Sequence, residues 1–137
     1  DLRLLSAFMQ MVRDLERIGD YAKDVAEISL KLFPYTEHQC LPAIAQMSHH
    51  ARAMLESSLV ALANLDGTAG PVIHKLDDNV DDAYAEIYQT LATQTNIQGS
   101  IEPIILLALT IRHLERMADH ATNIAYRVTF IVTGSRG

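Results

Sequence analysis

Apolar residues recur every three or four positions along almost the whole chain, and no segment alternates apolar and polar residues as a strand would. This pattern predicts an all-α fold, an up-down antiparallel bundle of four helices. The expected helices span residues 2–33, 41–64, 71–93 and 100–132. Pro34 stops the first, Ser100 is a plausible N-cap for the last, and Gly134 closes it ahead of a frayed tail at residues 135–137.

The first and last predicted helices share a motif. Residues 13–26 read RDLERIGDYAKDVA and residues 112–125 read RHLERMADHATNIA, with seven of the fourteen positions identical at an offset of 99 residues. Identity in register over this length indicates an internal duplication. If the repeated unit has three helices, residues 1–34 are the last helix of a first unit and residues 41–134 are a complete second unit. The chain would then be a fragment, or lack an N-terminal part.

Composition narrows the classes of partner. The chain has 137 residues and a net charge of −6, which disfavours nucleic acid or an anionic membrane as the main partner. No basic cluster longer than the isolated region from Arg112 to Arg116 appears in the sequence. The apolar runs are too short to span a bilayer. The single cysteine, Cys40, rules out an internal disulfide and a thiolate zinc site, and it fits a cytoplasmic location.

Carboxylates repeat one turn apart at the edge of the apolar face on three helices. The candidate ligands are Glu16, Asp20 and Asp24; Asp77 and Asp81; and Glu115 and Asp119, followed by Asn123. Residues four apart share one stripe of a helix, so two antiparallel helices can bring four carboxylates together. Such an oxygen-rich site suits a hard cation such as Mg, Ca, Mn or Fe. The alternative is a solvated acidic face that Arg17, Arg112 and Arg116 neutralise through ordinary surface pairs.

Other residues point to packing rather than chemistry. We interpret all six histidines as surface or ordinary packing residues, and the five methionines as core filler. No Glu-x-x-His pair, Gly-rich phosphate loop or nucleophile set is present. The expected core residues are Leu4, Leu5, Phe8, Leu15, Ile18, Ala22, Val25 and Ala26 in the first helix, and Leu107, Leu114, Ala118, Ala121 and Ala125 in the last.

The repeated motif, together with KLDDNVDDAY at residues 75–84, resembles the PhoU family over essentially the whole chain. Members of that family contain two three-helix units, each with an acidic signature on facing helices. The resemblance implies a second-unit metal cluster at Asp77, Asp81, Glu115 and Asp119, with Asn123 nearby. It also implies half of a first-unit cluster, at Glu16, Asp20 and Asp24. The metal would be Fe, Mn, Mg, Zn or Ca. Tyr126 stands where the first repeat has Glu27.

The resemblance further implies a cytoplasmic regulator that is not an enzyme. It would act between the phosphate ABC transporter ATPase and the phosphate-sensing histidine kinase, keeping uptake and the starvation response off when phosphate is plentiful. The uncovered face of the first helix predicts self-association, as a homodimer, or packing against a missing segment. Two alternatives stay open: the cytoplasmic domain of a sodium–phosphate cotransporter, and a di-metal carboxylate enzyme, which the lack of a histidine on the acidic stripe disfavours.

Overall fold

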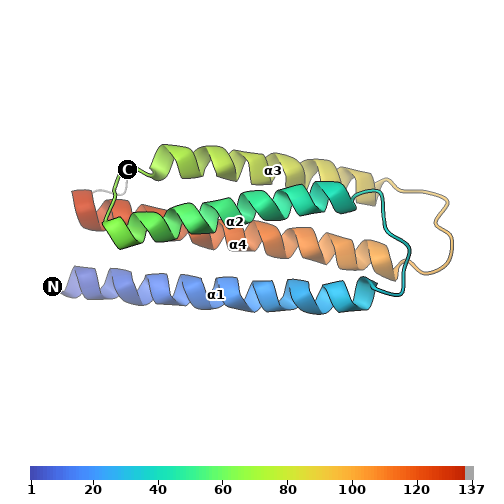
Figure 1. The fold of residues 1–137 in the computed structure, drawn as a ribbon, viewed down its shortest axis with the longest axis horizontal. Helices are drawn as coiled ribbons and strands as arrows, with labels where there is room; N and C mark the ends of the chain where they lie inside the picture. The colour runs from blue at the N-terminus through green and yellow to red at the C-terminus, as the bar shows by residue number, and fades with distance from the viewer. Residues whose placement is uncertain (135–137) are drawn as a thin grey trace.

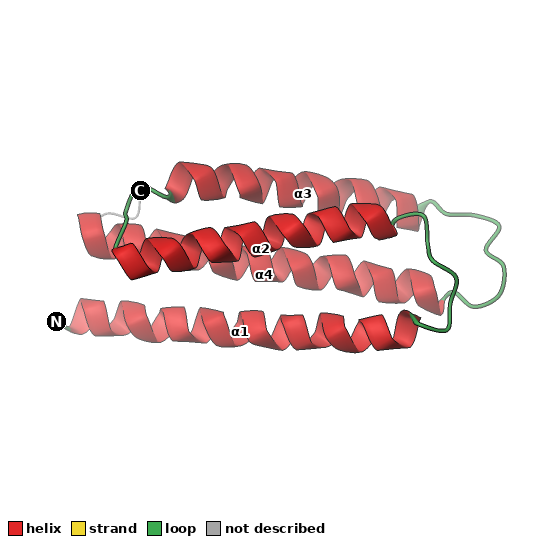
Figure 2. Cartoon of the chain, viewed as in Figure 1, coloured by secondary structure: helices red, strands yellow, loops and turns green. Residues whose placement is uncertain are grey.

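The computed structural model describes residues 1–134, which fold into four long α-helices and contain no strand. The helices are α1 (Leu2–Leu32), α2 (Leu41–Asn64), α3 (Gly70–Ala92) and α4 (Glu102–Thr133). They run side by side, and each is antiparallel to the next along the chain (Figures 1 and 2). The predicted all-α bundle is confirmed, with helix bounds within two residues of those expected. The predicted frayed tail lies outside the described residues.

Local signals end the helices where the sequence suggests. Gly134 has a φ of 73° and its N–H donates to the carbonyl of Phe130 at 2.8 Å, so it caps α4 in the left-handed conformation that glycine adopts freely. At the other end, α4 begins at Glu102, and Ile101 rather than Ser100 occupies the N-cap position. The Ser100 hydroxyl still accepts a hydrogen bond from the backbone N–H of Glu102 at 3.0 Å. It therefore satisfies one of the free donors of the first turn.

Helix α4 is the centre of the bundle. It packs against α1, α2 and α3, while α2 and α3 also pack against each other. The main core cluster lies among α2, α3 and α4 and includes Met47, Met54, Val80 and Ile111, each fully buried or nearly so. All the core residues predicted for the last helix are buried: Leu107, Leu114, Ala118, Ala121 and Ala125. The core side predicted for the last helix is therefore confirmed.

The prediction for the first helix was largely wrong. Of its eight expected core residues only Ile18 is buried, and Leu5 is 57% exposed. Met9, expected in the core, is 65% exposed, whereas Met11 is buried. The reason is that, among the described helices, the backbone of α1 comes close to α4 alone. The buried residues of α1 consequently form one seam: Ala7, Met11, Asp14, Ile18 and Ile28.

Candidate metal site

The packing of α3 on α4 brings together the four carboxylates of the predicted second-unit cluster. Asp77 and Asp81 lie one turn apart on α3, and Glu115 and Asp119 lie one turn apart on α4. The charge of Asp119 raises the pKa of each of the other three carboxyl groups, so these groups are close enough to interact. Their juxtaposition follows the expectation from the antiparallel arrangement. Their role as metal ligands stays a prediction.

The four carboxyl groups occupy an unfavourable environment for negative charge. Burial is the largest cause that raises the pKa of every one of them. Neighbouring carboxylates raise the pKa of Asp77, Asp81 and Glu115 further. Arginine compensates only in part: Arg112 donates to Glu115 Oε1 at 3.1 Å. The cluster therefore holds more negative charge than its surroundings neutralise.

One oxygen of this cluster has no partner. Asp77 Oδ1 is buried and makes no hydrogen bond, a costly state for a carboxylate oxygen. An oxygen donor left unpaired among like charges fits a hard cation chemically. As the side chains are placed, however, no group of three or more His, Cys, Asp or Glu residues within 1–134 is arranged to hold one ion. Binding would require the carboxylates to turn toward a common point, and Glu115 to share its oxygen with Arg112 or release it.

The remaining predicted ligands are not assembled with this cluster in the described chain. Asn123 is exposed and lines a groove between α1 and α4. Glu16 and Asp20 are exposed on α1, and Asp24 is half-buried there. Within residues 1–134 the backbone of α1 approaches only that of α4, so no further helix lies against α1 to supply the other carboxylates of this cluster. The first-unit cluster therefore stays a prediction.

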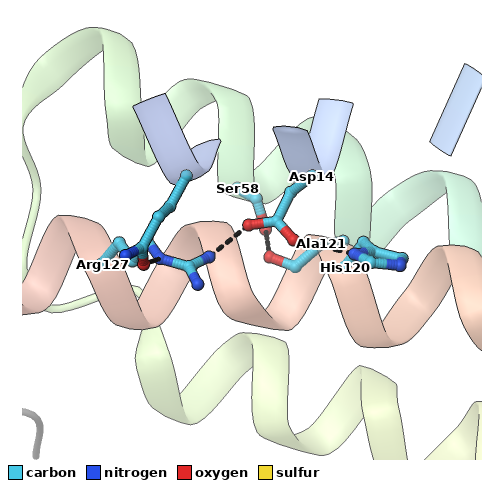
Figure 3. Close-up of polar contacts among 6 residues, drawn as sticks. Asp14, Ser58, His120, Ala121 and Arg127 are labelled. Carbon is cyan, nitrogen blue, oxygen red and sulfur yellow. Dashed lines mark hydrogen bonds and ion pairs between the residues drawn. The ribbon is translucent and has the colours of Figure 1, made fainter. Parts of the chain in front are cut away.

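Sequence reasoning missed a buried acidic residue at the α1–α4 interface. Asp14 is 5% exposed; its Oδ1 lies 2.7 Å from His120 Nδ1, and its Oδ2 accepts a hydrogen bond from Arg127 (Figure 3). Arg127 in turn donates from Nε to Gln10 Oε1 at 2.8 Å. The prediction of an ordinary packing role was incomplete for His120, because its ring nitrogen makes a hydrogen bond across the interface to the buried Asp14. A usable signal existed: Asp14 falls on the apolar stripe, between Met11 and Ile18.

The same interface shows how the two repeats are related. Tyr21 packs its ring against His113 and His120, with centroids 5.5 and 6.0 Å apart. The offset of 99 residues makes Tyr21 equivalent to His120, and Asp14 equivalent to His113. The contacts Asp14–His120 and Tyr21–His113 therefore exchange with each other when the repeats are swapped. This is the self-complementary pattern of a local twofold axis, and it supports an internal duplication.

A model of the PhoU domain matches residues 1–29 and 44–128. The chain belongs to the PhoU family. Among curated relatives, it is 62% identical over 136 residues to a phosphate-specific transport system accessory protein PhoU homolog from Synechocystis. It is 34% identical over 140 residues to a homolog from Xylella fastidiosa, and 30% identical over 135 residues to the accessory protein PhoU of Escherichia coli.

The alignments include nearly all of this chain but only part of each relative. The alignments include 99% of this chain for the Synechocystis and Xylella proteins and 98% for the Escherichia coli protein. The chain spans only 61%, 58% and 56% of the lengths of those three relatives. In the described part of the chain, no helix has an apolar stretch that could cross a bilayer.

Proposed function

We propose that the protein regulates phosphate uptake and the phosphate-starvation response through protein–protein contacts, without catalysing a reaction. Membership of the PhoU family carries this proposal, because curated relatives named as accessory proteins of the phosphate-specific transport system align along nearly the whole chain. The partners we propose are the transporter ATPase and the phosphate-sensing kinase. We also propose a cytoplasmic location, where both partners would present their soluble parts.

A divalent or trivalent hard metal ion is the second element of this proposal. The support is the donor set on α3 and α4, which is all oxygen, together with the unpaired Asp77 Oδ1. The proposed ligands are Asp77, Asp81, Glu115 and Asp119. An ion there would neutralise their repulsion and tie α3 to α4, which would make the shape of the regulatory surface depend on the bound metal. The first-unit residues Glu16, Asp20 and Asp24 would form a similar site on α1 with a further acidic helix.

The uncovered face of α1 supports the proposal of association. Leu2, Leu5 and Met9 are 84%, 57% and 65% exposed, and they share a surface groove with Val12. An apolar surface of this kind tends to bind a partner. We propose that it is covered by a second copy, giving a homodimer, or by a further segment of the protein. Light scattering tests this: a strictly monomeric chain at tens of micromolar would contradict self-association.

The regulatory proposal is tested in cells. Deleting the gene should leave alkaline phosphatase and phosphate uptake high in phosphate-rich medium, and the intact gene should restore repression. Complementation with the Asp81→Ala/Asp119→Ala double variant separates the need for the protein from the need for the acidic cluster. Normal induction and repression in the deletion strain would refute the proposal.

A cytoplasmic domain of a sodium–phosphate cotransporter is the second candidate function. It rests on the resemblance of the fold alone, and the accessory-protein names of the relatives favour the first candidate. The two differ in what the complete gene encodes. Membrane-spanning helices in the same polypeptide would favour the cotransporter, and further soluble helices would favour the regulator.

A further inference from the structure

Arginines that lie far apart in the sequence occur at equivalent positions of α1 and α4. In the sequence the region from Arg112 to Arg116 is an isolated basic cluster, but the repeated motif places two more arginines at the equivalent positions of α1, Arg13 and Arg17. Both pairs are separated by four residues, so each lies along one stripe of its helix. The two stripes can form one surface only if α1 and α4 present them on the same side of the bundle.

The contacts between α1 and α4 set their register. Asp14 pairs with His120, and Tyr21 packs on His113, so the helices are antiparallel and residue 17 lies level with residue 117. Arg17 and Arg116 therefore lie at nearly the same level of the bundle, next to the local twofold axis. Arg13 and Arg112 follow one turn away, in opposite directions along the bundle.

A groove shows that the two stripes border the same surface. Gln10 precedes Arg13 by three residues on its stripe, and Arg127 lies on the stripe of Arg116. These two residues hydrogen-bond at 2.8 Å and line a groove of about 560 Å³ between α1 and α4. The four arginines continue the same face toward the middle of the bundle. We call Arg13, Arg17, Arg112 and Arg116 the arginine band.

The arginine band is exposed in residues 1–134, and only Arg13 also lines the apolar groove of α1 that we propose is covered by a second copy or a further segment. All four residues are exposed, and Arg13, Arg17 and Arg116 form no ion pair within residues 1–134. Arg112 alone is engaged, with Glu115. Guanidinium groups form paired hydrogen bonds with carboxylates, so exposed arginines on two packed helices suit carboxylate recognition.

We propose that the arginine band docks an acidic, extended segment of a protein partner across the exposed α1–α4 face, next to the groove between these two helices. Charge complementarity argues for this occupant, because the band gathers four exposed positive charges, of which only that of Arg112 lies in an ion pair within residues 1–134, on a chain whose net charge is −6. The surroundings argue for a narrow ligand. Asp20 and Asp119 are exposed on the same helices and border the band, and with the net negative charge they would repel a broad anionic surface such as a membrane.

Fluorescence anisotropy with a labelled peptide of about ten glutamates tests the proposal directly. The Arg17→Glu/Arg116→Glu variant should weaken binding at least about tenfold, because it both removes and reverses the central charges. The control is Lys23→Glu/Lys75→Glu, which reverses the same number of exposed charges away from the band. It should change the affinity by less than about twofold. Circular dichroism checks that both variants fold, and Arg17→Gln/Arg116→Gln replaces the first variant if it does not.

Three results would overturn the proposal. Equal weakening by the band variant and its control would show that only net charge matters. Undetectable peptide binding at low salt would show that the band does not recognise carboxylates in this form. Sedimentation of the protein with phosphatidylglycerol vesicles, without peptide binding, would assign the band to a membrane surface instead. The regulatory function proposed above could survive each of these results, because its test in cells does not depend on the peptide.

Discussion

The two interfaces that α4 forms with α1 and with α3 differ in whether their carboxylate oxygens have partners. At the α1–α4 interface both oxygens of Asp14 are engaged, one by His120 and the other by Arg127. At the α3–α4 interface Asp77 has an oxygen without a hydrogen bond, and burial, followed by the charges of Asp81 and Asp119, raises the pKa of its carboxyl group. One helix therefore carries a satisfied acidic contact on one side and an unsatisfied acidic cluster on the other.

This difference in compensation of the buried charge distinguishes a structural site, at Asp14, from a site that can accept a ligand, at Asp77. A buried charge is tolerated when a partner of opposite sign compensates for the lost hydration, as for Asp14. Within residues 1–134 the cluster around Asp77 is compensated only in part, by Arg112 and Arg116 near Glu115 and Asp119, so protons or an external cation can remove more of the cost of its negative charge. We expect the α1–α4 interface to respond to mutation, and the α3–α4 interface to respond to solution conditions.

Asp14→Ala should have the largest effect. It leaves the partly buried Arg127 without its carboxylate partner and with Gln10 as its remaining acceptor, and removing one member of a buried pair costs about 3 kcal/mol. Urea unfolding followed by circular dichroism measures the loss. Asp20→Ala, on the exposed side of the same helix, is the matched control and should leave the stability nearly unchanged. A similar small loss for both variants would show that the ion pair is not structural.

Addition of Mn, Fe or Mg should raise the melting temperature of the chain. An ion that binds only the folded state at about a hundred times its dissociation constant stabilises it by about 2.7 kcal/mol. The Asp81→Ala/Asp119→Ala double variant should abolish the increase, whereas Asp14→Ala should retain it. A melting temperature indifferent to these ions and to chelator would identify the cluster as a solvated acidic face.

Acidification should stabilise the metal-free chain through the α3–α4 cluster. Folding raises the pKa of these carboxyl groups above the ordinary carboxyl value of about 4. Their contribution to the free energy of unfolding is therefore fully present below that value, and it is lost as the pH rises through the raised pKa values. Solvent screening of these partly exposed groups limits the gain to a few tenths of a kcal/mol each. The difference in urea midpoint between pH 5 and pH 7 should be smaller in Asp81→Asn/Asp119→Asn. An equal difference would assign the pH dependence to other groups.

Arg112→Ala should have the smallest effect on folding. Its bond to Glu115 is a partly exposed contact one turn apart, a kind of pair that contributes about 0.5 kcal/mol or less. Arg116→Ala, which breaks no ion pair within residues 1–134, is the control for the loss of charge alone. Both changes should matter less for regulation than the loss of the bundle, as measured by repression of alkaline phosphatase. A loss of stability near that of Asp14→Ala would contradict the distinction between the two interfaces.

The sequence predicted features that depend on local or repeated signals. Pro34 and Gly134 act on their own helix ends, so the helix bounds could be predicted. The meeting of Asp77 with Asp119 needed only helical spacing and antiparallel neighbours. The core face of α1 could not be derived in the same way, because apolar residues such as Leu5 and Met9 occur around much of this helix and only the neighbour decides which are covered. The Asp14 contact joins residues more than a hundred positions apart, and it depends on a register that no local pattern encodes.

The unequal contacts of the helices have a consequence for how the fold opens. The backbone of α1 comes close to that of α4 alone, and Met11 and Ile18 share a small cluster with Ala61 of α2, whereas α2, α3 and α4 all pack on one another. We therefore expect α1 to detach before the three-helix core opens. Native-state hydrogen exchange would show this as a lower free energy of opening for the amides of α1 than for the centre of α4. The loop from Phe33 to Cys40 would then act as a tether. The boundary between the two repeats would appear as a boundary between cooperative unfolding units.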